Sequence, residues 1–175
     1  MNQPSAVLHL PMRVIYIAGT SHSGSTLLDL MLIAHPAIFS AGEVLKLNRQ
    51  LEISDPRKQT YVRCPCGAPS LWQCPVWSCV DARTRETAGK SLADLDMFDA
   101  KPTRRKAPNA IVFKAIADVS GKSFVVDSSK MPKRLSYLMR LEELDVYPCI
   151  SSATQGADQL GGSQARRLPQ AHPPL

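Results

Sequence analysis

The stretch that decides the fold is Arg13-Val-Ile-Tyr-Ile-Ala-Gly19-Thr-Ser-His-Ser-Gly24-Ser-Thr-Leu-Leu-Asp-Leu-Met-Leu-Ile-Ala34. Its first six residues are almost all apolar, which is typical of a strand buried on both faces of a parallel sheet. A polar loop with two glycines follows, and residues 25–34 predict a helix that ends before His35-Pro36, because proline disfavours helical backbone in the preceding residue. A strand, a glycine loop and a helix in this order open an α/β nucleotide-binding unit. We therefore predict an α/β fold with a P-loop-type parallel sheet flanked by helices.

Composition indicates one ordinary globular domain. The chain has 175 residues, of which 44% are hydrophobic and 21% charged, enough for a core of its own. The formal net charge of +6 suits an anionic ligand and equally suits plain solubility. Aromatic residues make up only 6% and do not interleave with basic runs, so nucleic-acid binding is not expected. We find no signal-peptide pattern and no transmembrane segment, since no apolar run reaches roughly 18 residues, and we expect a cytoplasmic protein.

Further segments extend the alternation of strands and helices. In the first half we expect a short strand or turn and then a helix in residues 37–51, an irregular Cys- and Pro-rich insertion at about 54–80, and a helix in 81–99. In the second half we expect a basic linker at 101–108, a helix at 109–119, a buried strand at 123–127, a loop at 128–130 and a helix at 131–144. Asn109 is expected to cap the 109–119 helix and Gly121 to end it.

The loop from Gly19 to Thr26 has the spacing of a Walker A loop, except that Ser25 replaces the lysine. Backbone N–H groups at a helix N-terminus converge on an anion, and the helix dipole adds to the attraction. The hydroxyls of Ser23, Ser25 and Thr26 can donate further hydrogen bonds. Without the lysine, the loop suits one phosphate-like group better than a magnesium-bound triphosphate. The alternative interpretation is a serine-rich turn without a ligand.

Taken together, the motifs resemble those of the P-loop sulfotransferases that use 3′-phosphoadenosine-5′-phosphosulfate (PAPS), in particular their bacterial branch. The resemblance covers about residues 13–146 and rests on the glycine loop with its helix, His35-Pro36, Gly42-Glu43, and Val125 to Lys130 with Pro132, Arg134 and Leu135. It implies transfer of a sulfuryl group from PAPS to an acceptor hydroxyl or amine. It also implies that PAPS is the co-substrate and that no metal is required.

The resemblance assigns roles to individual residues. The PAPS-binding residues would be Thr20, Ser21, His22, Ser23, Gly24, Ser25, Thr26, Leu27, Ser128 and Ser129. The catalytic residues would be Glu43 as general base, and His22 and Lys130 at the sulfuryl group, where charge develops as the bond breaks. Simpler interpretations are a solvated histidine, a first-turn glutamate favoured by the helix dipole, a Ser-Ser pair capping the next helix, and a solvated lysine.

Cysteines are concentrated in one short segment. The four cysteines Cys64, Cys66, Cys74 and Cys79 are candidate zinc ligands, although their spacing is not the paired C-x-x-C of common zinc ribbons. Reduced, partly buried thiols near Trp72 and Trp77, or a disulfide-bonded loop, are the alternatives. In relatives a similar stretch forms a lid-like insertion, which would border the acceptor site.

Two other functions fit part of the sequence pattern. A P-loop small-molecule kinase would need the Walker lysine and a magnesium carboxylate, and Ser25 argues against it. A non-enzymatic module would bind zinc through the cysteines and a partner through the basic segments.

The resemblance ends after Pro148. Relatives bind the 3′-phosphate through a stretch similar to His-Leu-Val-Arg-Asp-Pro-Arg, and this chain has Cys149-Ile-Ser-Ser-Ala-Thr-Gln-Gly156. We therefore divide the chain into a partial sulfotransferase domain, 1–148, and a tail, 149–175, whose composition predicts disorder. The fold would then be incomplete on its C-terminal side, and a chain truncated in this way would be inactive.

Our hypothesis for the tail is a shifted reading frame near Tyr147 to Cys149. The codons TGC ATC TCG TCC GCG ACC CAA GGN encode Cys149 to Gly156, and read from the third base they become CAT CTC GTC CGC GAC CCA AGG, which encodes His-Leu-Val-Arg-Asp-Pro-Arg. The synonymous bases are chosen for the match, but the first two bases of most codons are dictated by the protein. Sequencing of the gene from the codon of Leu144 onward is expected to find this reading continued as an open frame. Codons that forbid it would make the tail native sequence.

Overall fold

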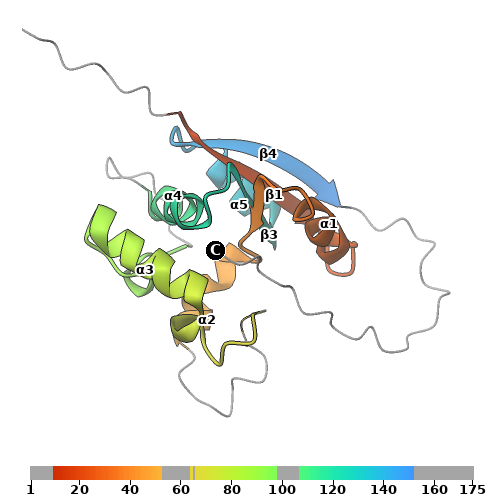
Figure 1. Cartoon of the computed structure of the whole chain (residues 1–175). Coiled ribbons are helices and arrows are strands. Elements are labelled where there is room, and N and C mark those ends of the chain that lie inside the picture. The colour runs from red at the N-terminus through yellow and green to blue at the C-terminus, as the bar shows by residue number, and fades with distance from the viewer. Residues whose placement is uncertain (1–9, 53–63, 65, 98–106, 152–175) are drawn as a thin grey trace, which may run out of the picture.

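A computed structural model of the chain describes residues 10–52, 64, 66–97 and 107–151. These residues form a four-stranded parallel sheet flanked by helices (Figure 1). The predicted α/β class is therefore confirmed. Among the described residues, no helix has the length and apolar character needed to cross a bilayer.

The sheet has its longest buried strand in the middle. Its strands are β1 (Met12–Gly19), β2 (Ile38–Ser40), β3 (Phe124–Lys130) and β4 (Leu144–Ser151). They lie in the order β2-β3-β1-β4, and every neighbouring pair is parallel. The apolar run of β1 is buried from Val14 to Ala18, as expected for a strand covered on both faces. Because all strands run in the same direction, their carboxyl ends lie together along one side of the sheet, which we call its carboxyl edge.

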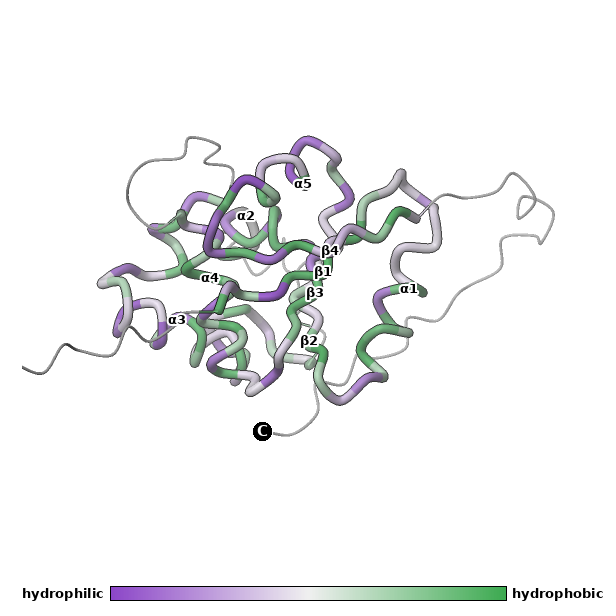
Figure 2. Tube along the Cα trace, turned by 90° about the horizontal axis from the view of Figure 1, so that it is seen from above, coloured by the Kyte–Doolittle hydropathy of each residue, from purple (hydrophilic) through white to green (hydrophobic). Residues whose placement is uncertain are grey.

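Helices lie on both faces of this sheet. They are α1 (Ser25–Leu32), α2 (Leu47–Glu52), α3 (Pro75–Ala88), α4 (Pro108–Ser120) and α5 (Pro132–Leu138), with 3₁₀ turns η1 (Val44–Lys46), η3 (Leu71–Gln73) and η4 (Leu92–Asp94). Figure 2 views the sheet along its edge, with α1 on one side and α2, α3 and α4 on the other. The larger core, which includes Tyr16, Phe113 and Ile116, lies on the second side. A smaller cluster of Ile15, Ile17 and Val126 packs against Leu28 and Leu32 of α1.

Several predicted boundaries are wrong, each for a local reason. The segment predicted irregular already becomes helical at Pro75, because Val76, Trp77, Val80 and Thr84 form one buried helix face. The predicted helix 131–144 ends at Leu138, since Leu144 instead pairs with Met12 as the start of β4.

Strand ends also extend beyond their predicted limits. The predicted loop 128–130 is the end of β3. β4 continues through Ser151, three residues past the expected domain boundary, and Pro148 is tolerated because β4 lies at the edge of the sheet. Most of the cysteine-rich insertion before Cys64, most of the basic linker, and the rest of the tail lie outside the described residues.

A buried ion pair links the sheet to the helices on its larger core. The Nε of Arg134 donates to Oδ2 of Asp127 at 2.9 Å, and their side chains are 3% and 0% exposed. The other guanidinium nitrogens donate to the Met97 carbonyl at 2.9 Å and to Asn109 Oδ1 at 2.8 Å. Asn109 is therefore not the helix cap that we predicted, because the cap position is Ala107. The side-chain oxygen of Asn109 instead accepts a hydrogen bond from Arg134. Gly121, by contrast, ends α4 as predicted.

Arg134→Met is expected to lower the free energy of unfolding by about 3–5 kcal/mol, because it leaves the carboxylate of Asp127 buried without its cation. Equilibrium urea unfolding followed by circular dichroism measures the loss. The matched control is Arg85→Met, whose guanidinium pairs with Asp81 on the surface and whose loss should change stability little. Equal effects of the two variants would contradict a central role for the buried pair.

Candidate functional site

Three of the predicted motifs meet at the carboxyl edge of the sheet. In the β1–β3 register Ala18, the residue before Gly19, lies opposite Lys130. The N–H of Ser128 donates to the carbonyl of Gly42 at 2.8 Å, which holds Gly42-Glu43 against the end of β3. The glycine loop, Gly42-Glu43 and the end of β3 thus come from distant parts of the chain and lie side by side. Ligands of parallel α/β sheets bind at this edge.

The glycine loop leads directly from β1 into α1. Gly24 is the N-cap of α1 with φ 77°, and no side chain caps the helix. The first backbone N–H groups of α1 therefore lack the usual side-chain acceptor and are free for another one. His22 also has a positive φ, 62°, so the backbone turns sharply at two points between the strand and the helix. This is the geometry in which N–H groups converge on an anion.

Ser23 supplies a polar group with no partner inside this loop. Its side chain is 6% exposed, and its hydroxyl makes no hydrogen bond. The hydroxyl lies close over Gly19, because a Cβ on Gly19 would sit 2.8 Å from it and 2.5 Å from the carbonyl oxygen of Ser151. Gly19 therefore admits no side chain without a shift of the loop. A buried hydroxyl without a partner is uncommon, and a ligand oxygen in the loop would satisfy it.

The remaining predicted PAPS-binding residues fall into two groups. Thr20, Ser21, His22, Gly24, Thr26 and Leu27 are exposed, whereas Ser25, Ser128 and Ser129 are buried. The hydroxyl of Ser129 is engaged inside the protein, since it donates to Asp127 Oδ1 and accepts from the N–H of Leu45 at 3.0 Å. Ser129 thus stabilises the end of β3, and its hydroxyl is already engaged. The exposed residues of the glycine loop are the ones that a ligand can reach.

The predicted catalytic residues Glu43 and Lys130 form an ion pair. Nζ of Lys130 lies 3.5 Å from Oε1 of Glu43, and both side chains are 28% exposed. Lys46 contacts the other carboxylate oxygen. Lys130 has φ 68°, a backbone conformation that costs a residue with a Cβ about 1–2 kcal/mol. Glu43 therefore lies between two ammonium groups at the sheet edge. His22 lies in the adjacent loop.

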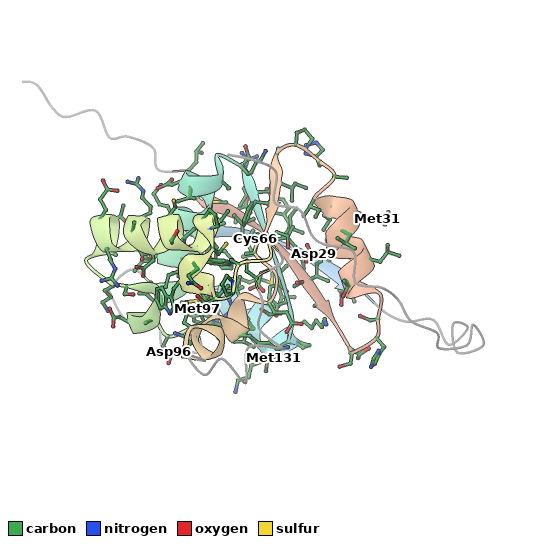
Figure 3. All side chains as sticks on the ribbon, turned by 60° about the horizontal axis from the view of Figure 1, so that its bottom comes forward. Asp29, Met31, Cys66, Asp96, Met97 and Met131 are labelled. Atoms are coloured by element: carbon green, nitrogen blue, oxygen red, sulfur yellow. The ribbon has the colours of Figure 1, made fainter. Side chains whose placement is uncertain are left out.

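Sequence reasoning missed the role of Asp29. This carboxyl is 5% exposed on the sheet side of α1, whereas Met31 points to solvent (Figure 3). Ser40 Oγ donates to its Oδ2 at 2.9 Å. Burial raises the pKa of Asp29, and hydrogen bonds from Ser40 and Ser128 offset part of that rise. The signal in the sequence was an acidic residue inside an otherwise apolar helix, since such a residue must either face solvent or find buried partners.

The cysteine segment forms a compact thiol cluster. The Sγ atoms of Cys64, Cys66 and Cys74 all lie within 4.8 Å of one another, whereas Cys79 lies exposed on α3 and is not part of the group. Burial raises the pKa of Cys64. For Cys66 the effect of burial is outweighed by hydrogen bonds from the Ala68 N–H and the neighbouring thiols, which lower its pKa.

This cluster corrects the expectation that no metal is required. The described residues bring together a set of thiols able to hold a metal ion, which the sulfotransferase resemblance did not imply. The four-cysteine candidate is reduced to three ligands.

In comparisons with known proteins, no family model, curated protein or solved structure matches the chain. The sulfotransferase resemblance therefore rests on the motifs themselves.

Asp29→Asn is expected to stabilise the protein increasingly as the pH rises. Because its pKa is raised above the ordinary 3.8, the folded chain holds this proton more tightly than the unfolded chain. The unfolding free energy thus falls from about pH 3.8 through the folded pKa and then levels off. The variant lacks this fall, so its advantage grows by up to about 1.4 kcal/mol per pH unit in that window.

Urea unfolding of the wild type and Asp29→Asn at a series of pH values measures this advantage. The control is Glu142→Gln, an exposed carboxyl, which should show no such trend. An advantage that shrinks with rising pH would contradict the raised pKa.

Proposed function

We propose that the chain is a sulfotransferase-like protein that binds the 5′-phosphosulfate of PAPS in the loop Thr20 to Leu27. The reaction proposed for this site is transfer of the sulfuryl group to an acceptor hydroxyl or amine, and this chain, with Cys149-Ile-Ser-Ser-Ala-Thr-Gln-Gly156 in place of the 3′-phosphate stretch, is expected to bind PAPS without turnover. The observation that carries the proposal is the partnerless buried hydroxyl of Ser23, in the loop that leads into the uncapped N-terminus of α1. A cytoplasmic location remains the prediction from the sequence.

The charges around the loop favour a ligand that presents one phosphate-like group over a ligand that presents a triphosphate. Ser25, at the position of the Walker lysine, is 3% exposed, so this helix start presents N–H groups and hydroxyls without a cation. Such a set binds one tetrahedral anion through charge-assisted hydrogen bonds. The cations at this edge are Lys130 and Lys46, which belong to neighbouring segments and stand beside the carboxylate of Glu43.

This arrangement suits sulfuryl transfer. The oxygen or nitrogen of the acceptor attacks the sulfur in line, its proton passes to the carboxylate of Glu43, and the bond from sulfur to the bridging oxygen breaks. The electron pair of that bond leaves with adenosine 3′,5′-bisphosphate. Lys130 and His22 stabilise the negative charge that develops on the bridging and sulfuryl oxygens. The contact with Nζ of Lys130, 3.5 Å from Oε1, holds the carboxylate of Glu43 at this edge, where it can accept the proton of the acceptor.

Ser23→Ala is expected to weaken PAPS binding by about tenfold or more, because a hydrogen bond to a charged group contributes about 1.5–3 kcal/mol. The same change should leave the thermal midpoint of the free protein unchanged or raised, since it removes a buried hydroxyl without a partner. Isothermal titration with PAPS and a thermal melt of each protein measure both effects. Ser78→Ala, an exposed serine of α3, is the matched control for binding and stability.

The choice of titrants separates the competing functions. Adenosine 5′-phosphosulfate, which has no 3′-phosphate, should bind with a similar dependence on Ser23, because both ligands present the same end to the loop. Magnesium-dependent ATP binding in place of PAPS would favour the small-molecule kinase. If the wild type binds none of these nucleotides, or if Ser23→Ala binds PAPS as well as the wild type does, the proposed function is wrong.

A further inference from the structure

We propose that Cys64, Cys66 and Cys74 form a zinc site, with a water molecule as the fourth ligand. The site uses none of the residues assigned to PAPS and does not depend on the proposed sulfotransferase function.

The distances between the sulfur atoms suit a tetrahedral metal. Zinc–thiolate bonds of about 2.3 Å in tetrahedral geometry place sulfur atoms about 3.8 Å apart. The three Sγ atoms all lie within 4.8 Å of one another, and those of Cys66 and Cys74 are 3.5 Å apart. Small side-chain rotations therefore suffice to bring the three thiolates onto one ion.

The backbone around the cluster is held in place without the metal. Gly67, at φ 86°, donates its N–H to the carbonyl of Cys64 at 2.8 Å, which closes a tight turn around Cys66. Cys74 is the N-cap of α3, and the N–H of Ser78 donates to its carbonyl at 2.9 Å. A turn thus presents two thiols to the third at the start of a 14-residue helix.

Burial defines which side of the site is open. Cys64 is 3% and Cys74 0% exposed, both within the larger core, and Cys66 is exposed. The ion would thus lie at the boundary between the core and solvent, with its fourth position toward solvent on the side of Cys66. A soft set of three thiolates selects zinc over magnesium or calcium, which prefer oxygen ligands.

Metal binding is a proton exchange without oxidation. Three S–H bonds break, three Zn–S bonds form, the protons pass to solvent, and the complex of Zn²⁺ with three thiolates carries a net charge of −1. No oxidant is needed, in contrast to a disulfide between Cys66 and Cys74.

The ion would tie the start of α3 to the turn before it. Trp72, between the turn and α3, donates its Nε1–H to the carbonyl of Leu51 at the end of α2 at 3.4 Å. The zinc would thereby fix the orientation of α3 against α2 through the segment 64–74.

The full chain, expressed in zinc-supplemented medium and purified without chelator, is expected to contain about one zinc per chain by elemental analysis. Cys66→Ser should bind zinc at least about tenfold more weakly, because a thiolate ligand contributes more than the outer contacts whose loss has that effect. Cys66 is exposed, so this variant is expected to fold. Cys79→Ser, an exposed cysteine of α3 outside the cluster, is the matched control and should retain the metal.

Thiol titration gives a readout that does not depend on elemental analysis. With zinc bound, only Cys79 and Cys149 should react rapidly with a thiol reagent, and a strong chelator should release the other three. Cobalt in place of zinc should give a thiolate-to-metal charge-transfer band that is lost in Cys66→Ser and kept in Cys79→Ser.

Three results would overturn the zinc site. The first is purified protein without zinc that also fails to bind added zinc or cobalt. The second is copper in place of zinc. The third is a cluster whose thiols are freed by reductant and not by chelator, which would identify a disulfide. None of these results bears on PAPS binding, so the zinc site and the proposed function can fail separately.

Discussion

The ion pair between Asp127 and Arg134 is the interaction on which the larger core depends. Two charges with side-chain exposures of 0% and 3% are tolerated in a protein interior only when their hydrogen bonds are complete. Here each guanidinium nitrogen has an acceptor, on β3, on α4 or on the carbonyl of Met97. The single side chain of Arg134, from α5, therefore sets how these segments lie against the sheet. An apolar residue in its place could fill the space but could not specify this arrangement.

The same carboxylate shapes the edge of the sheet where the candidate site lies. Oδ1 of Asp127 accepts from the N–H and the hydroxyl of Ser129, and Ser129 in turn accepts from the N–H of Leu45. The next residue, Lys130, turns to φ 68° and reaches Glu43. A half-buried ion pair is thus positioned by a fully buried one, through consecutive residues of one strand. Changes in the helical core would displace the ammonium group of Lys130 without touching it.

The elements that could be predicted are those whose buried residues form a simple apolar pattern along the sequence. The apolar runs of β1 and β3 indicated central parallel strands, and the glycine loop with α1 followed from local spacing. The boundary between α5 and β4 was not predictable, because Leu138, Leu141 and Leu144 fit a helix as well as a buried turn and a strand start. Pairing with Met12 decides between them.

The network around Arg134 joins residues up to 37 positions apart, which no local pattern encodes. In the candidate site, the motifs placed Glu43 and Lys130 together, but the partners of Asp29 and the exclusion of Cys79 from the thiols depend on how the chain folds in three dimensions.

The contact between the first and last described strands has a consequence for the order in which the protein forms. Gly19 lies opposite Ser151, and the hydroxyl of Ser151 donates to the carbonyl of Ser23, 128 positions earlier. Contacts of such long range are made late, because the closure of a large loop of chain comes before any gain from the contact. On a ribosome that adds about 5–20 residues per second, the glycine loop would wait on the order of ten seconds for this strand. The motif that is synthesised first is therefore the one completed last, because the glycine loop of a nascent chain lacks its contact with Ser151 until β4 has joined the sheet.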